Sequence, residues 1–269
     1  MSLTYDSTGI RLLRKKFALD NPAEPIIALT GNPNTGKSTV FNQLTGLNQH
    51  TGNWPGKTVS RARGHYLYQN KKYTVIDLPG TYSLSVTSVE ERINRDFICF
   101  ARPEVTVIMA DATCLERNLN LTLQILELTN NALLCLNFMD DAERKNINID
   151  IRGLSEDLQI PVIPAVAREG RGLLQLKEKI ARLIAGEIKI RPVTVNYSSE
   201  IQKAVNHIIP EIKAKYGPLC TYINCHWLAL RLLEGDKTIL DSIYTYLNHI
   251  LVSNSGQKHR RRMVADEIF

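Results

Sequence analysis

Apolar residues in the first two thirds of the chain fall into short, unbroken runs separated by amphipathic stretches. The runs predict strands at residues 26–31, 62–68, 73–78, 105–111, 132–138 and 161–166. Unbroken apolar runs are typical of strands that are covered on both faces of a parallel sheet. Amphipathic periodicity between the runs predicts helices that include residues 37–45, 119–130 and 173–186. This alternation indicates a doubly wound α/β sheet.

The connection between the second and third predicted strands is unusually short. It comprises only Gln69 to Lys72, which cannot make a parallel crossover, so this pair must be antiparallel. The pattern changes after Tyr197, where apolar periodicity predicts helices with no strand between them, at residues 199–216, 220–234 and 238–252. We therefore predict a mostly parallel sheet with one antiparallel strand, followed by a small all-α domain.

These patterns divide the chain into four parts. We predict an N-terminal extension at 1–25, an α/β domain at 26–190, a helical domain at 191–255 and a basic tail at 256–269. One stretch fits no regular element: HTGNWPGKTVSR, His50 to Arg61, has glycines and a proline that would break a helix and interrupt a strand. It places Trp54 and Thr58 in a predicted loop.

Composition narrows the functional classes. Of 269 residues, 43% are hydrophobic, which is enough to build a core. The net charge of +6 includes four positive charges from KHRRR (258–262), which leaves +2 for the remainder and little support for a nucleic-acid-binding face. The tail itself is either a solvated linker or a contact for anionic lipid or RNA.

Cysteine usage and hydropathy indicate the compartment. The five cysteines include no C-x-x-C pair, so we expect neither a disulfide framework nor a zinc site, and a reducing cytosol fits best. His207, His226 and His249 are too dispersed along the chain to predict a metal site. No apolar stretch approaches the ~20 residues needed to cross a bilayer, and the first 25 residues lack a signal-peptide core. We expect this chain not to span a membrane by itself.

The segment GNPNTGKS, residues 31–38, follows the first predicted strand and opens a helix, as the Walker A pattern requires. In such a loop successive backbone amides face an anion. Lys37 would reach the β- and γ-phosphates of a nucleotide, and the Ser38 hydroxyl would bind Mg²⁺. A later strand ends in DLPG, where Asp77 could hold the water shell of the metal and the Gly80 amide could bind a γ-phosphate oxygen. Alone, D-x-x-G is a common turn, but one strand-length after a Walker A loop the metal- and phosphate-binding interpretation is favoured.

The segment NFMD, residues 137–140, stands where another buried strand ends. The carboxylate of Asp140 could accept the N1–H and N2–H of guanine, whereas adenine has no N1 proton to donate. Asn137 would bond the base or tie back to the phosphate loop. The alternative is an Asn/Asp cap for a helix that starts near Asp141.

Four stretches together resemble the cytosolic N-terminal domain of FeoB, the family of prokaryotic ferrous iron transporters, which has a Ras-like G domain. They are GNPNTGKST, GNWPGKTV, DLPGTYSL and, in the helical part, HWLALRLLEGD. The resemblance runs from about residue 26 to about residue 252. It implies a GTPase that regulates or drives ferrous iron uptake, with GTP or GDP, magnesium and, as a further candidate, potassium as cofactors.

The resemblance also implies partners and a location. A membrane transport domain of the same full-length protein would follow, so that the chain would be a soluble fragment of an integral protein, on the cytoplasmic side of the inner membrane. A small cytosolic accessory protein of the iron-uptake system and a second copy of the chain are candidate partners, and no nucleic acid is expected. The alternative is a soluble ribosome- or RNA-associated Era-like GTPase, but the basic RNA-binding domain of that class is missing once the tail is discounted.

By the same resemblance, the nucleotide-binding residues would be Asn34, Thr35, Gly36, Lys37, Ser38, Thr39, Gly56, Thr58, Asp77, Gly80, Asn137, Asp140, Val166 and Ala167. Of these, Asn34, Lys37, Thr58 and Gly80 would act in catalysis, and Ser38, Thr58 and Asp77 would hold magnesium. Potassium would bind Asn34 and the backbone carbonyls around Gly52 and Trp54. The Trp54 ring would either cover the nucleotide or anchor the open loop.

Three positions depart from the pattern of Ras-like GTPases. Thr81 follows Gly80 where a water-orienting glutamine is usual, so we expect slow hydrolysis. Phe138 replaces the usual lysine beside the base, and Val166-Ala167 replaces the usual Ser-Ala, whose backbone amides could still contact guanine O6. In the helical part, core packing or a ligand surface would explain residues such as Trp227 and Leu228.

Overall fold

The computed structural model describes residues 13–19, 24–47, 49–85, 87–216, 220 and 223–254. The chain forms two compact units. The first, here the sheet unit, comprises Leu19–Ile98 and Arg102–Val195. The second, here the helical unit, comprises Met1–Ala18, Cys99–Ala101 and Asn196–Phe269. The predicted N-terminal residues 1–12 and the basic tail 256–269 lie outside the described residues.

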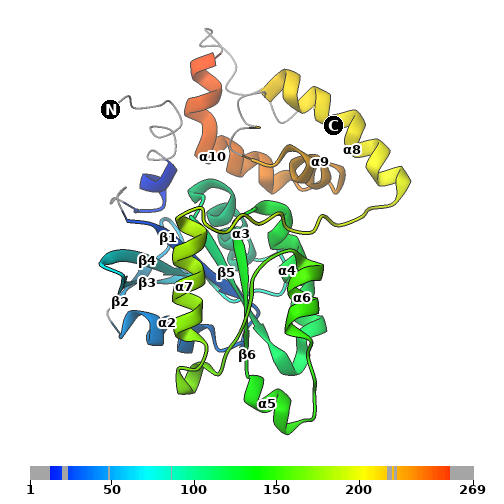
Figure 1. Cartoon of the computed structure of the whole chain (residues 1–269). Coiled ribbons are helices and arrows are strands. Elements are labelled where there is room, and N and C mark those ends of the chain that lie inside the picture. The colour runs from blue at the N-terminus through cyan, green and yellow to red at the C-terminus, as the bar shows by residue number, and fades with distance from the viewer. Residues whose placement is uncertain are drawn as a thin grey trace. The chain divides into compact units, whose positions relative to one another are not determined.

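The sheet unit is built on a seven-stranded sheet in the order β2-β3-β4-β1-β5-β6-β7 (Figure 1). The strands are β1 (Ile26–Gly31), β2 (Gln49–Asn53), β3 (Ser60–Tyr68), β4 (Lys71–Asp77), β5 (Val105–Asp111), β6 (Ala132–Asn137) and β7 (Val162–Pro164). β3 pairs antiparallel with both β2 and β4, and the other pairs are parallel. The prediction of a mostly parallel sheet with one antiparallel strand is therefore confirmed.

Helices cover both faces of this sheet. The helices between and after the strands are α2 (Lys37–Thr45), α3 (Val89–Asp96), α4 (Leu115–Leu128), α5 (Met139–Arg144), α6 (Ile151–Leu158) and α7 (Leu173–Ile184). The π-helical turn η1 (Phe97–Ala101) continues α3, and the 3₁₀ turns are η2 (Ala112–Cys114) and η3 (Ala167–Glu169). α2 and α7 pack on one face, over a core of alternate strand residues such as Leu29, Val75 and Val107, while α4 and α6 cover the other face (Figure 1). This burial explains the unbroken apolar runs, because both faces of each central strand are covered.

The helical unit contains α8 (Ser199–Tyr216), α9 (Cys225–Leu233) and α10 (Lys237–Asn254). The Asn224 side chain caps the N-terminus of α9. Its Oδ1 accepts hydrogen bonds from the backbone N–H groups of His226 at 3.0 Å and Trp227 at 3.4 Å. Trp227 and Leu228 are 3% and 2% exposed, so the core-packing interpretation of these residues is confirmed.

Part of the N-terminal extension belongs to the helical unit. The Phe17 ring stacks on Tyr246 of α10, and Tyr246 stacks in turn on Phe100, both with 4.8 Å between ring centroids. Lys16 Nζ donates to the carbonyl oxygen of Tyr246 at 3.2 Å, and Arg14 Nε donates to that of Ala101 at 3.2 Å. The last turn of the α3–η1 helix, Cys99–Ala101, is thereby built into the same unit.

Two sequence-based expectations are wrong. The first half of HTGNWPGKTVSR is not irregular, because Gln49–Asn53 pairs with β3 as strand β2, from Gln49↔Gly64 to Asn53↔Ser60. The chain also contains a disulfide, between Cys220 and Cys225. The chain brings their Cα atoms to 5.5 Å although no C-x-x-C motif marks the pair, and this distance suits a disulfide. Among the described helices, none is both long enough and apolar enough to cross a bilayer.

Candidate functional site

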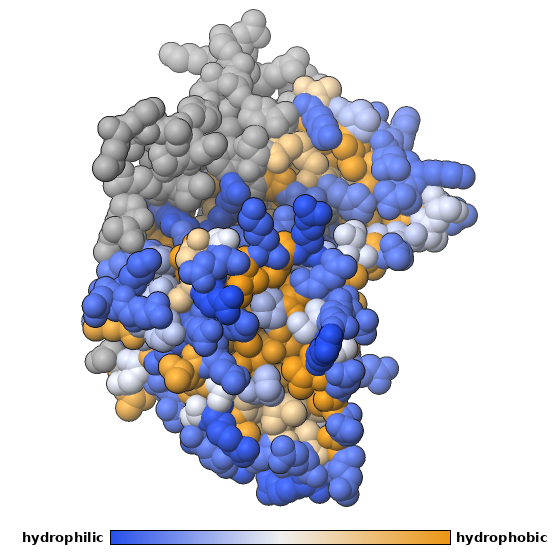
Figure 2. All heavy atoms as spheres, viewed as in Figure 1, coloured by the Kyte–Doolittle hydropathy of each residue, from blue (hydrophilic) through white to orange (hydrophobic). Residues whose placement is uncertain are grey.

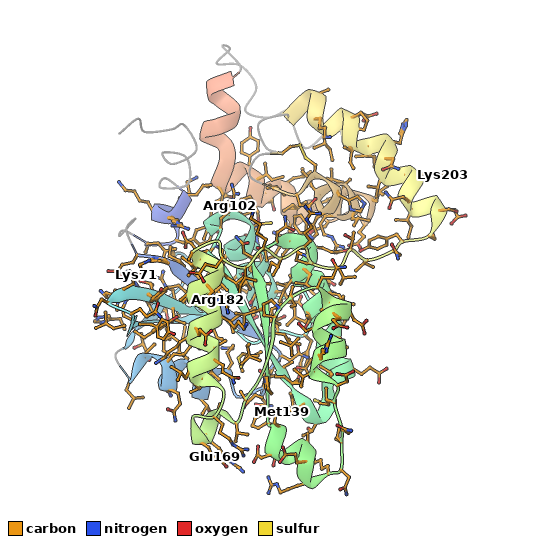
Figure 3. The ribbon with its side chains drawn as sticks, in the orientation of Figure 1. Lys71, Arg102, Met139, Glu169, Arg182 and Lys203 are labelled. Atoms are coloured by element: carbon orange, nitrogen blue, oxygen red, sulfur yellow. A yellow bond between two sulfur atoms is a disulfide. The ribbon has the colours of Figure 1, made fainter. Side chains whose placement is uncertain are left out.

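The predicted site residues gather at the carboxyl ends of β1, β4 and β6. In an open α/β sheet, ligands bind outside these ends, at the strand where the chain order reverses direction. Here that strand is β1, because β4 lies on one side of it and β5 on the other. Met139 and Glu169, which follow β6 and β7, lie at the same end of the unit, away from Lys71 and Arg102 (Figure 3).

The loop between β1 and α2 is a tight backbone turn. Gly36 has a φ of +79°, and a Cβ at this residue would overlap Nδ2 of Asn137. The Thr35 hydroxyl donates to the carbonyl oxygen of Asn32 at 2.8 Å, which holds the turn from within. The side chain of Asn32 is 3% exposed, and neither its oxygen nor its nitrogen has a hydrogen-bond partner in the described part of the chain. An unpartnered buried amide at this loop is consistent with a polar ligand here.

Lys37 and Asp77 form an ion pair at the centre of the site. Lys37 Nζ donates to Asp77 Oδ1, and the two side chains are 11% and 17% exposed. Burial raises the pKa of Asp77, and the charge and hydrogen bond of Lys37 offset part of this rise. A partly buried cation and a partly buried carboxylate therefore stand together, as a phosphate and a metal ion would require.

Asn137 ties the phosphate loop to the loop after β7. Its Nδ2 donates to the carbonyl oxygen of Thr35 at 3.0 Å, and its Oδ1 accepts from the backbone N–H of Ala167 at 2.9 Å. Of the two roles considered for Asn137, the structure shows the tie to the phosphate loop. The Ala167 amide is engaged in this bond, and Val166 and Ala167 are both buried.

Asp140 lies in the first turn of α5. The helix begins at Met139 and its N-cap is Phe138, which makes no side-chain cap, so the alternative of an Asn/Asp cap near Asp141 is wrong. Asp140 Oδ2 accepts a hydrogen bond from Arg168, whereas its buried Oδ1 has no hydrogen-bond partner among the described residues. A buried carboxylate oxygen without a donor is suited to a ligand that brings N–H groups.

The segment from Gly52 to Thr58, which includes the end of β2 and most of the loop to β3, is mostly exposed. Trp54 is the exception at 3% exposure: its ring lies edge-on to Phe97 at 5.4 Å and beside the Arg61 guanidinium at 5.4 Å. The ring thus anchors the loop in this structure. The carbonyl oxygen of Trp54 accepts from the Lys57 amide at 2.9 Å.

Several residues predicted for the site are exposed and make no side-chain hydrogen bonds with the other site residues in the described part of the chain. Thr58 and Asn34 are exposed, and neither makes a side-chain hydrogen bond or ion pair with the residues that the structure describes. Ser38, Thr39 and Gly56 are exposed as well. The structure therefore joins Lys37 to Asp77 and Asn137 to Thr35, whereas Thr58 makes no side-chain hydrogen bond with Ser38 or Asp77.

The segment after β4 contains residues that sequence reasoning missed. Glu91 and Ser88 form a reciprocal cap at the start of α3, and Glu91 also accepts hydrogen bonds from Ser83 and Thr87. The S-x-x-E spacing of Ser88 and Glu91 was a readable signal for this cap. Thr81 is 4% exposed and its hydroxyl donates to the Ser83 carbonyl at 2.8 Å, so it bonds within its own loop.

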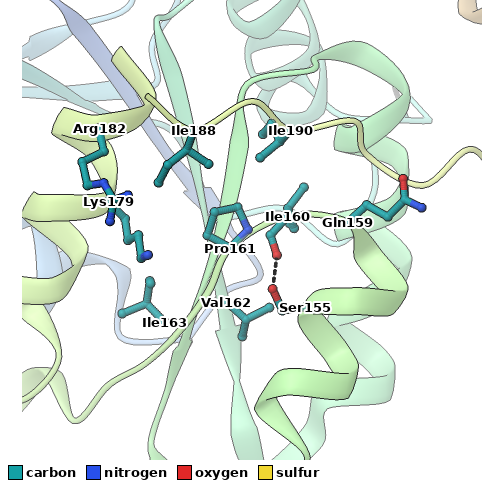
Figure 4. Close-up of a pocket in the computed structure, with 10 residues that line it drawn as sticks. All are labelled: Ser155, Gln159, Ile160, Pro161, Val162, Ile163, Lys179, Arg182, Ile188 and Ile190. Carbon is teal, nitrogen blue, oxygen red and sulfur yellow. Dashed lines mark hydrogen bonds between the residues drawn. The ribbon is translucent and has the colours of Figure 1, made fainter. Parts of the chain in front are cut away.

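A separate pocket of about 410 Å³ lies along the edge strand β7 (Figure 4). Ile160, Val162, Ile188 and Ile190 line it, and Figure 2 shows apolar surface between α6 and α7 on this face. It shares no residue with the predicted nucleotide site. Within the described ranges, no group of three or more His, Cys, Asp or Glu side chains could hold a metal ion.

Known sequences match both parts of the chain. The family model described as ferrous iron transport protein B matches residues 25–180, and the model of the FeoB cytosolic helical domain matches residues 197–264. The Fe(2+) transporter FeoB of Escherichia coli K12 is 42% identical over 218 residues, which cover 78% of this chain and 27% of that protein. A Porphyromonas gingivalis protein, described as a fusion of Fe(2+) transport protein A with FeoB, is 39% identical over 213 residues, covering 78% of this chain and 25% of that protein. The chain thus spans about a quarter of the length of these two relatives.

Solved structures of related proteins have the same fold. The cytosolic domain of Thermotoga maritima FeoB in a GDP form aligns with a TM-score of 0.76 and 32% identity, over 82% of this chain and 85% of that chain. The Methanococcus jannaschii FeoB G domain aligns with a TM-score of 0.54 and 43% identity, over 60% of this chain and 98% of that chain. The first family model alone covers more than half of the sequence. The chain therefore belongs to the FeoB family of ferrous iron transport proteins, and it contains the G domain, which has the P-loop GTPase fold, and the cytosolic helical domain.

Proposed function

We propose that this chain binds GTP and GDP together with Mg²⁺ and slowly hydrolyses GTP to GDP and phosphate. The observation that carries the proposal is the buried Asp140 Oδ1, which has no partner in the described part of the chain and stands at the same sheet end as the Lys37–Asp77 pair. The carboxylate can accept two N–H groups of guanine, and adenine offers no matching pair. The GDP and GMPPNP forms of the related Thermotoga maritima domain support a guanine nucleotide.

Magnesium would be held by Ser38, Asp77 and Thr58. The donor set fits, because Mg²⁺ takes hydroxyl and carboxylate oxygens and keeps part of its water shell. Asp77 is mostly buried and already paired with a cation, which supports its role as a ligand for a positive ion. Bound magnesium would neutralise charge on the β- and γ-phosphates. Lys37 supplies a second positive charge from the protein itself.

Slow hydrolysis follows from the residue at position 81. The Thr81 hydroxyl donates to the Ser83 carbonyl, so it is not directed at an attacking water. Potassium would then supply the positive charge that other GTPases obtain from an arginine. Asn34, Gly52 and the Trp54 carbonyl are the proposed ligands. The exposed side chain of Asn34 makes no hydrogen bond with the described residues, which supports its availability.

Calorimetry and phosphate release test the nucleotide proposal. We expect GTP and GDP to bind and ATP to bind far more weakly, and Lys37→Ala or Ser38→Ala to abolish triphosphate binding. Lys71→Ala, at an exposed lysine that begins β4, is the matched control and should bind as the wild type does. ATP binding as tight as GTP binding would refute the base site. Equal GTP turnover in sodium and potassium salts would refute the role of potassium.

We also propose that the chain acts at the cytoplasmic side of the inner membrane, as the part of a ferrous iron transporter that regulates or drives uptake. An accessory protein is a proposed partner, supported by the Porphyromonas gingivalis relative that is described as a fusion with Fe(2+) transport protein A. A homo-oligomer is a further proposal, which light scattering with and without nucleotide would test.

A chimera tests the transport role. This chain would replace the matching N-terminal part of the Escherichia coli FeoB protein in cells that lack their own ferrous iron transporter. We expect ferrous iron uptake from the chimera, a loss of uptake with Lys37→Ala and normal uptake with Lys71→Ala. Uptake that is insensitive to Lys37→Ala would show that transport does not depend on this site.

A further inference from the structure

Asn94 on α3 connects three segments around the phosphate loop. Its side chain is fully buried, at 0% exposure. Its Oδ1 accepts a hydrogen bond from the Thr30 hydroxyl on β1 at 2.8 Å. Its Nδ2 donates to the carbonyl oxygen of Pro79 at 2.8 Å and to that of Glu90 at 2.9 Å. One side chain therefore joins the strand that carries the phosphate loop to the DLPG segment after β4.

The bond to Pro79 fixes the direction of a second group. The carbonyl of Pro79 and the N–H of Gly80 belong to one planar peptide unit, and the described chain has no cis peptide bonds. In a trans peptide the C=O and N–H point in opposite directions. Because Asn94 holds the carbonyl, it also directs the Gly80 N–H away from α3.

The phosphate loop lies against this same peptide. A Cβ at Gly80 would be only 3.3 Å from Pro33 Cα. The N–H of the next residue, Thr81, donates to the carbonyl oxygen of Gly31 at 3.2 Å. The Gly80 amide is thus held between a fixed carbonyl on one side and the phosphate loop on the other.

Another buried asparagine shows what a purely local role looks like. Asn118 on α4 is 3% exposed and bonds only one turn back, from its Nδ2 to the carbonyl oxygen of Cys114 at 2.8 Å and to the Cys114 sulfur at 3.4 Å. Its Oδ1 has no hydrogen-bond partner in the described part of the chain. Asn94, by contrast, uses its oxygen and both N–H groups, and it spans β1, α3 and the DLPG segment.

We propose that Asn94 is a positioning residue for recognition of the terminal phosphate: it orients the Pro79–Gly80 peptide so that the Gly80 N–H is presented to the γ-phosphate of GTP. The inference rests on the proposed function, namely that this site binds GTP. GDP has no γ-phosphate and does not need this amide. Asn94 therefore affects the preference for triphosphate over diphosphate.

Nucleotide affinities test this role. We expect Asn94→Ala to weaken binding of GMPPNP, a GTP analogue that resists hydrolysis, by roughly tenfold, because a hydrogen bond to a charged group is lost or misdirected. GDP has no γ-phosphate to accept a hydrogen bond from the Gly80 N–H. Its affinity should therefore escape the roughly tenfold loss that one strong hydrogen bond represents, and should stay within about twofold of the wild-type value. In Asn94→Ala, both the kcat for GTP and the affinity for GMPPNP should fall.

Two further variants separate this role from stability. Thr30→Val removes the donor that orients Asn94 and should shift the GMPPNP-to-GDP affinity ratio in the same direction by a smaller factor, whereas Thr30→Ser keeps the hydroxyl and should restore the wild-type ratio. Asn118→Ala is the matched control, which should lower the thermal midpoint and leave the ratio unchanged.

The outcomes distinguish the two proposals. If the wild-type chain binds neither nucleotide, the proposed function fails. If the wild-type chain binds both and Asn94→Ala leaves the GMPPNP-to-GDP ratio unchanged, the role of Asn94 is overturned and the proposed function stands. Should Asn94→Ala fail to fold, the Thr30 variants decide, and equal ratios for Thr30→Val and Thr30→Ser would overturn the inference.

Discussion

Gly36→Ala perturbs the phosphate loop at its tightest point. Gly36 has a φ of +79°, and an added Cβ would overlap Nδ2 of Asn137 and lie 3.3 Å from Cζ of Phe138. Asn137 is 1% exposed and cannot move aside without losing its bonds to Thr35 and Ala167. The substitution therefore strains the backbone and also disconnects the phosphate loop from the loop after β7.

The magnitude follows from these two effects. An alanine in the left-handed conformation costs roughly 1–2 kcal/mol. The two hydrogen bonds of Asn137 contribute about 1 kcal/mol each. Gly186→Ala is a matched control, because Gly186 has a φ of +73° and nothing within 4 Å of the added Cβ. We expect Gly186→Ala to carry only the backbone cost of a left-handed alanine. Gly36→Ala also loses the two hydrogen bonds of Asn137, so it should be less stable than Gly186→Ala by about 2 kcal/mol.

The assay can be confined to the sheet unit. The chain has two tryptophans, Trp54 in the sheet unit and Trp227 in the helical unit. In a Trp227→Phe background, tryptophan fluorescence during urea unfolding reports on the sheet unit alone. GDP titration should also show weaker binding for Gly36→Ala than for Gly186→Ala. Equal losses of unfolding free energy in the two variants, with equal GDP affinity, would refute the steric argument.

Three further changes have defined outcomes. Asp140→Asn should weaken GDP binding about 10- to 100-fold, because the unpartnered Oδ1 would become a neutral group; calorimetry with GDP and ADP would show any retained preference. Burial tends to raise the pKa of Glu91, but hydrogen bonds to its carboxylate outweigh burial and keep the pKa below its ordinary value of 4.5. The ionised carboxylate therefore stabilises the fold above about pH 4.5, and this stabilisation is lost as the pH falls through the lowered pKa. Urea unfolding between pH 3 and 6 should therefore show a flatter pH dependence for Glu91→Gln. Trp54→Ala removes the packing on Phe97 and keeps the backbone carbonyl, so trypsin should cut faster after Lys57 while potassium stimulation persists.

The parts of the fold that could be predicted are those with a local signal. β1 and α2 lie at the residues predicted, because an apolar run, a glycine loop and a helix start follow one another within a short stretch. The carboxyl ends of β1, β4 and β6 then had to meet at one edge, since parallel strands place these ends together. The grouping of phosphate and base residues followed from strand order rather than from any single motif.

The parts that could not be predicted depend on distant partners. Asn94 gives no signal of its own, because its three bonds reach Thr30 and Pro79 as well as its own helix. The disulfide between Cys220 and Cys225 likewise depends on how the chain turns before α9. A sequence pattern states which residues can bond, whereas the tertiary fold selects which of them do.

The loop between β2 and β3 shows how such selection shapes the proposed function. β2 contains Gly52 and Asn53, which disfavour strands, and it forms because β3 offers a paired edge. Two backbone bonds close the tip, from the Trp54 N–H to the Val59 carbonyl at 3.0 Å and from the Lys57 N–H to the Trp54 carbonyl at 2.9 Å. Within this hairpin, residues 55–58 take no part in the hydrogen bonds that pair its two strands, and Thr58 is among them. Under the proposed function Thr58 would move toward the metal. Such a movement would break the Lys57 bond, at about 1 kcal/mol, whereas the Trp54 ring and the paired residues of β2 lie outside residues 55–58. The proposed response to the γ-phosphate would thus be confined to the tip of a hairpin whose strands are paired in the sheet.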